Sequence, residues 1–167
     1  WTKKFDMRHQ GWQYPAVGKL GPRGPLAVVV PVGGITGKIQ FPLIGGLRLQ
    51  NAVVALDAVT GEELWRVDEE PWPWSTAAGD EDALQKDRIN NRKDPRSEQS
   101  CIPDIQGIPL ITGDGTVYSS SSHNGDLRAI RDANGNGKIE QEEVSIFSTS
   151  QCFLNSPSVA QGMLVAA

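Results

Sequence analysis

A series of short β-rich runs separated by glycine turns constrains the fold of this chain more than any other feature of its sequence. The turns include VTGE, GDG and HNGD. Helical periodicity is nearly absent, and 18 glycines and 11 prolines among 167 residues are too many breakers for a helical bundle. Short strands with glycine-rich turns are typical of all-β sandwiches, barrels and propellers. The β-rich runs are 26–32, 52–56, 63–67, 116–120, 127–130, 144–147 and 163–166.

Internal repeats favour the propeller among these architectures. The segments Pro15-Ala-Val, Pro109-Leu-Ile and Pro157-Ser-Val share a local pattern, and their prolines are 94 and 48 residues apart. These separations correspond to two units and one unit of roughly 47 residues, which is the size of a four-stranded propeller blade. The sequence therefore predicts an all-β chain built from repeated blades.

One segment carries the most specific pattern in the chain. Residues 52–67 read AVVALDAVTGEELWRV, with Ala55, Asp57, Gly61 and Trp65 in the spacing A-x-D-x-x-x-G-x-x-x-W. Asp57 can accept hydrogen bonds from the backbone amides of a turn, and Gly61 can adopt the positive φ that reverses the chain. Trp65 offers a large flat face that is suited to bridging neighbouring blades.

This pattern resembles the tryptophan-docking repeat of the pyrroloquinoline-quinone-type (PQQ-like) β-propellers. That family includes quinoprotein dehydrogenases and non-catalytic outer-membrane assembly lipoproteins. The resemblance implies a partial propeller of about three four-stranded blades, which is a fragment of, or is completed to, a seven- or eight-bladed propeller. Trp1 would then belong to the end of a preceding blade, with residues 1–6 as its outer strand. We therefore expect a piece of a longer polypeptide, or a chain that another subunit completes.

The resemblance also predicts how the chain is organised. We expect residues 1–68 to form a blade region with an insertion at 33–50. Residues 69–107 would form a polar and charged insertion. Residues 108–167 would form a blade that carries a calcium-binding loop, followed by the start of the next blade.

That loop is the segment DANGNGKIEQEE at 132–143, which matches the EF-hand calcium-loop template. Calcium binding needs hard oxygen donors at alternate positions of one tight loop, with a glycine at the sharp turn. Asn in place of Asp at two positions lowers the charge density, so we expect modest affinity, about 10⁻⁵ to 10⁻³ M. The predicted ligands are Asp132, Asn134, Asn136, Lys138 (through its backbone carbonyl), Glu140 and Glu143.

The sequence on either side of the loop departs from the EF-hand family. LRAIR before the loop and VSIFS after it are typical of strands, not of helices. The loop stands where a tight turn of the blade is expected, and Arg131 and Ile139 replace the Asp and Trp of the docking pattern. We expect a structural calcium clip that joins two strands. The alternative is an acidic hairpin that binds no ion.

Two further pairs of residues carry open alternatives. Cys101 and Cys152 lie in polar surroundings, and they either form a disulfide in an oxidising compartment or are two unrelated thiols. Trp72 and Trp74, which are spaced by prolines, either hold the insertion against the propeller or present a platform for a ligand or partner.

Composition and motifs narrow the function classes. The net charge of −4 argues against a general nucleic-acid binder, and no apolar run reaches the length of a membrane span. His9 and His123 are isolated, and the sequence contains no hydrolase elbow or phosphate-binding loop. No vicinal cysteine pair of the kind that many quinoprotein dehydrogenases carry is present.

These observations leave two main hypotheses. The first is a non-enzymatic, calcium-stabilised propeller scaffold or accessory subunit that contacts other protein subunits outside the cytosol, in the periplasm, an organelle lumen or the secreted space. The second is a fragment of a PQQ-dependent alcohol or sugar dehydrogenase, for which the sequence offers no identifiable quinone ligands. A cell-surface carbohydrate-binding propeller that uses Trp72 and Trp74 is a third hypothesis.

Overall fold

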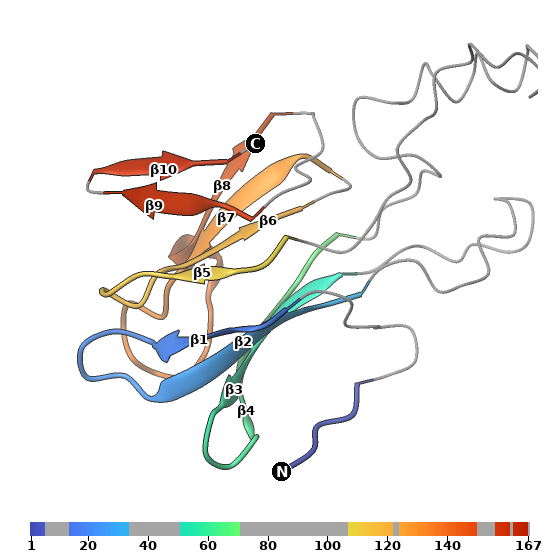
Figure 1. The fold of residues 1–167 in the computed structure, drawn as a ribbon, viewed down its shortest axis with the longest axis vertical. Coiled ribbons are helices and arrows are strands. Elements are labelled where there is room, and N and C mark those ends of the chain that lie inside the picture. Colours follow the sequence, from blue (N-terminus) through green and yellow to red (C-terminus); the bar gives the residue numbers. More distant parts are fainter. Residues whose placement is uncertain are drawn as a thin grey trace, which may run out of the picture.

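The computed structural model of the chain is all-β, as the sequence predicts, and its described residues form three antiparallel sheets (Figure 1). The described residues are 1–5, 14–33, 51–70, 107–121, 124–149, 156–160 and 162–166. None of these segments forms a helix with the length and apolar character needed to cross a membrane. The strands are β1 (Ala16–Lys19), β2 (Leu26–Val32), β3 (Ala52–Asp57), β4 (Glu63–Asp68), β5 (Leu110–Ile111), β6 (Val117–Ser120), β7 (Asp126–Ile130), β8 (Val144–Ser148), β9 (Ser158–Ala160) and β10 (Met163–Val165), and a 3₁₀ turn, η1 (Gln141–Glu143), precedes β8.

The first sheet has the strand order β1-β2-β3-β4, so each strand pairs with its neighbour in sequence. Its inner strand β3 is the most buried, because residues 52–56 are all enclosed. Successive side chains of a strand point to opposite faces, and both sets in β3 are apolar. A strand of this composition needs cover on both faces of its sheet.

The second sheet repeats this construction with the order β5-β6-β7-β8, and β9 and β10 form a separate hairpin. Its strands β6 and β7 are joined in a register that places Val117 opposite Ile130. The predicted insertions at 33–50 and 69–107 fall largely outside the described residues.

The core consists of two clusters that lie on opposite faces of the first sheet. Val53 and Ala55 of β3 pack with Trp65 of β4 against Val117 and Ile130 of the second sheet. The alternate β3 residues Ala52, Val54 and Leu56 form the other cluster, against which Phe5 packs. The two-residue period of one strand therefore joins the sheets on one side and holds the N-terminal segment on the other.

The N-terminal segment differs from the prediction that residues 1–6 form an outer strand. Residues 1–5 are described and form no strand. A strand needs a partner whose backbone groups it can pair with, and none of the described strands pairs with this segment. Side chains hold it instead: Phe5 packs on the core, and Lys3 Nζ lies 3.6 Å from Glu63 Oε2 on β4.

A buried ion pair also connects the two sheets. Glu69, directly after β4, contacts Arg128 of β7 through its carboxylate, and these residues are only 4 % and 6 % exposed. Arg128 Nη2 also lies 3.0 Å from Asp126 Oδ2, and Ser121 Oγ donates to Glu69 Oε2 at 3.3 Å. A charge removed from water is tolerated only when its partners are in place, so these contacts act as a unit.

We therefore predict that Arg128→Met destabilises the protein strongly. The variant leaves the Glu69 carboxylate buried without its cation, and we expect the free energy of unfolding to fall by about 3–5 kcal/mol. Urea denaturation monitored by tryptophan fluorescence measures the change.

A matched control is Arg131→Met, because Arg131 forms an exposed pair with Asp114 at 3.3 Å. Removing this surface pair should cost at most about 1 kcal/mol. Equal losses in the two variants would contradict the role assigned to the buried pair.

Candidate functional site

The turn between β3 and β4 is closed by the side chain of Asp57. Its Oδ1 accepts hydrogen bonds from the N–H groups of Val59 and Thr60, both at 2.8 Å. The backbone closes the same turn, because Asp57 N donates to Glu62 O and Gly61 N donates to Asp57 O. The N–H donors of Thr60 and then Val59 hold the pKa of Asp57 below its ordinary value. The carboxylate therefore stabilises the turn in its ionised form.

Trp1 docks on this turn. Its indole Nε1 donates to Ala58 O at 3.1 Å. Gly61 has a φ of 75°, and a Cβ placed there would lie 2.5 Å from Trp1 Cδ2. Glycine is therefore required at position 61 for two reasons. Its backbone is in the left-handed region, and the indole ring occupies the space that a side chain would fill.

Trp65 lies on β4 in register with Ala55 of β3. Its indole is 6 % exposed and packs in the cluster that joins the two sheets. The small side chain of Ala55 leaves room beside the ring. The four residues of the docking pattern thus share one strand pair, with the turn at its end and Trp65 on the face that meets the second sheet.

The candidate metal loop connects β7 to β8, at the same end of the molecule as the β1–β2 turn (Figure 1). Arg131 N donates to Glu143 O at 3.0 Å, which draws the two ends of the loop together. This position corresponds to that of the β3–β4 turn in the first sheet. The two sheets therefore share one strand order and differ in the length of this connection.

Asp132 at the start of the loop faces its interior. Oδ1 accepts from the N–H groups of Gly135 and Asn136 at 2.7 and 3.1 Å, and Oδ2 accepts from Gly137 N at 2.8 Å. These donors come from the tip of the loop, so one carboxylate orders the whole glycine-rich turn.

Glu143 at the end of the loop reaches back to its beginning. Its Oε1 accepts from Ala133 N at 2.8 Å and Asn134 N at 3.2 Å, and its Oε2 accepts from Glu140 N at 3.1 Å. A side-chain hydrogen bond with Glu140 and then the backbone N–H groups hold the pKa of Glu143 below its ordinary value. The first and last acidic residues of the loop are thus both turned inward.

The amide side chains of the loop connect its middle. Asn134 Oδ1 accepts from Asn136 N at 2.9 Å, and Asn136 Oδ1 accepts from Lys138 N at 2.8 Å. The two Nδ2 groups donate to Glu140 Oε2 and Oε1 at 3.1 and 2.8 Å. The predicted ligands therefore contact one another through a continuous network of hydrogen bonds.

The chemistry of this set suits a hard cation, although its side chains are not arranged as a metal cage. Among the described residues, no three His, Cys, Asp or Glu side chains form a group that could hold a metal ion. The loop oxygens are carboxylate, amide and carbonyl oxygens, which are the ligands Ca²⁺ prefers.

Several predicted residues lie outside the described part of the chain. The proposed Cys101–Cys152 disulfide and the two tryptophans of the insertion, Trp72 and Trp74, are among them. His9 and His123 are as well. Their roles stay predictions.

Sequence reasoning missed two features of the structure. One is the buried pair of Glu69 and Arg128. The spacing of Asp126 and Arg128 places both on one face of a strand and could have indicated it. The other is a cavity of about 880 Å³ between the turns of the two sheets, which leaves no signal in the sequence because its walls come from four separate segments.

No family model, curated protein or solved structure matches this chain. Its function is therefore inferred from the contacts of its own residues.

We predict that Gly61→Ala expels Trp1 from the turn. The methyl group would collide with the indole, and alanine is strained at this φ, so the free energy of unfolding should fall by about 1–3 kcal/mol. Urea denaturation of the wild type, Gly61→Ala, Trp1→Ala and the double variant separates the backbone strain from the collision with the indole. When Trp1 is already replaced by alanine, Gly61→Ala should cost only the strain, so its effect on the free energy of unfolding should be smaller than in the wild type. A Gly61→Ala variant as stable as the wild type would refute the docking contact.

Proposed function

We propose that the chain is a segment of a β-propeller that serves as a non-enzymatic, calcium-stabilised scaffold or accessory subunit. The observation that carries this proposal is the packing of two successive four-stranded sheets, with the same strand order, through the buried ring of Trp65. The seating of Trp1 on the turn that follows β3 supports it, since an indole from the N-terminal segment is held against the first sheet at Gly61 of that turn.

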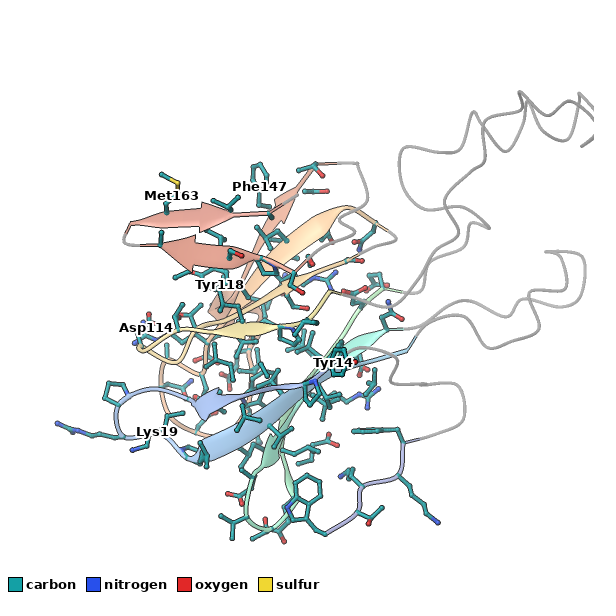
Figure 2. The ribbon with its side chains drawn as sticks, viewed as in Figure 1. Tyr14, Lys19, Asp114, Tyr118, Phe147 and Met163 are labelled. Atoms are coloured by element: carbon teal, nitrogen blue, oxygen red, sulfur yellow. The ribbon has the colours of Figure 1, made fainter. Side chains whose placement is uncertain are left out.

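The uncovered surface of the C-terminal strands supports a scaffold role. Phe147 of β8 and Met163 of β10 are 64 % and 62 % exposed, and both project away from the core in Figure 2. Ile146, Val159 and Val165 are also exposed on these strands. Exposed large apolar side chains gathered on neighbouring strands favour a contact site. A further sheet, from the rest of the same propeller or from another subunit, would cover it.

The calcium part of the proposal assigns the loop at 132–143 the role that the Asp57 turn has in the first sheet. Asp132 and Glu143 would hold the ion with the amide oxygens of Asn134 and Asn136, and the carbonyl of Lys138 and Glu140 would complete the set. The ion would neutralise the loop carboxylates and fix β7 to β8. Asp132 retains acceptor capacity for it, because an ionised carboxylate offers about four lone-pair sites and three are used.

We predict that Ca²⁺ raises the melting temperature of the wild type and that Asp132→Ala combined with Glu143→Ala abolishes the rise. At a calcium concentration of about 100 times the Kd, binding to the folded state adds about 2.7 kcal/mol to its stability. Differential scanning calorimetry with calcium or chelator measures it.

Glu142→Gln is the matched control, because Glu142 is an exposed neighbour of Glu143 outside the predicted ligand set. It should respond to calcium as the wild type does. A wild type whose melting temperature is unchanged by calcium would overturn the calcium site.

The alternative, a fragment of a PQQ-dependent alcohol or sugar dehydrogenase, makes a different prediction. A scaffold should show no dye-linked dehydrogenase turnover with alcohols or sugars when PQQ and Ca²⁺ are added to the protein. Reproducible turnover above a control without PQQ would overturn the non-enzymatic proposal. Binding of PQQ, measured by quenching of tryptophan fluorescence, provides a second readout.

A further inference from the structure

The loop at 132–143 of the second sheet borders a cavity between the turns of the two sheets. The cavity has a volume of about 880 Å³, within the range of small-molecule sites. Its walls are the β1–β2 turn, the β5–β6 turn that carries Asp114 in Figure 2, residues 64 and 65 of β4, and the first half of the loop at 131–143.

The two tryptophan contacts explain why the space is open. In the first sheet, the indole of Trp1 leaves no room for a Cβ on Gly61. In the second sheet, a Cβ on Gly135 or on Gly137 would meet nothing within 4 Å, although both glycines line the same cavity as Trp65. The longer loop therefore stands away from Trp65, and the space that a docked ring would fill is left as a cavity.

Two residues that line this cavity, Trp65 and Arg23, carry hydrogen-bond donors that have no acceptor among the described residues. Trp65 is 6 % exposed, its indole N–H donates to no described residue, and that nitrogen is not among the fully enclosed polar atoms. The indole of Trp1, by contrast, donates to a backbone carbonyl. Arg23, on the β1–β2 turn, forms no ion pair or hydrogen bond within the described part of the chain. An acceptor on a ligand in the cavity can pair with such donors in place of water.

The other charged side chains that line the cavity already have partners. Asp114 accepts from Thr112 Oγ1 at 2.6 Å and pairs with Arg131 at 3.3 Å. Asp132 accepts three backbone N–H groups. Arg23 is therefore the charged side chain of the cavity that has neither an ion pair nor a hydrogen bond among the described residues, and the side chains of Leu20 and Leu64 add apolar surface.

We propose that this cavity binds a small organic carboxylate with an apolar body. The carboxylate would accept hydrogen bonds from the Arg23 guanidinium and the Trp65 N–H, and the apolar body would contact the leucines and the indole edge. This site goes beyond the scaffold role and does not require calcium. Because Asp132 lines the cavity, an ion bound in the loop would strengthen carboxylate binding, and the carboxylate would strengthen ion binding by the same factor.

Phenylacetate is the probe, with its neutral isostere phenylacetamide for comparison. Both are titrated across the millimolar range into ¹⁵N-labelled protein containing a chelator, so that the result is independent of the calcium site. We expect phenylacetate to shift one indole N–H resonance, which Trp65→Phe removes from the spectrum. We expect Arg23→Gln to weaken phenylacetate binding about tenfold and to leave the weaker binding of phenylacetamide unchanged.

Arg66→Gln is the matched control, since Arg66 lies on β4 beside Trp65, pairs with Asp68 at 2.7 Å and does not line the cavity. It should bind phenylacetate as the wild type does. The proposal is overturned if no indole resonance shifts, if acid and amide bind equally, or if Arg23→Gln binds like the wild type. Arg23 is an exposed turn residue, so Arg23→Gln should fold, and its binding decides the test even if Trp65→Phe does not fold.

Discussion

The structure depends on the burial of β3 on both faces. Its five apolar residues alternate, so Val53 and Ala55 join the second sheet while the other three face the N-terminal segment. Each fully buried aliphatic side chain contributes about 1.5–3 kcal/mol relative to an exposed one, so this strand is a main source of stability. Trp65, paired with Ala55, extends the same core across the gap between the sheets.

A second constraint acts at the ends of the strands. In the first sheet the short turn at 58–62, closed by Asp57, leaves room for the Trp1 ring beside Gly61. In the second sheet the loop encloses its own carboxylates, and its glycines line a cavity together with Trp65. A single exchange of a short turn for a long loop thus links the candidate ion site and the proposed carboxylate site. The first depends on oxygens inside the loop, and the second on the space outside it.

Much of the architecture was predictable because it is encoded locally. The strands on either side of Gly61 and of the loop at 132–143 follow from alternating apolar residues and glycine turns, and the structure has them within two residues of the predicted bounds. Asp132 and Glu143 accept hydrogen bonds from backbone N–H groups of their loop, and their role as calcium ligands stays a prediction. Residues 1–5 were predicted wrongly as a strand, since none of the described strands pairs with them through its backbone.

By itself, the sequence determined the strand pattern, the docking turn and the oxygen-rich loop, because each depends on residues close together in the chain. Only the tertiary structure decided that Glu69 meets Arg128, that Trp1 fills the space beside Gly61 and that Trp65 borders a cavity with Arg23. These contacts join segments that are far apart in sequence. They depend on how the two sheets pack and on the space left between their turns, which no local pattern specifies.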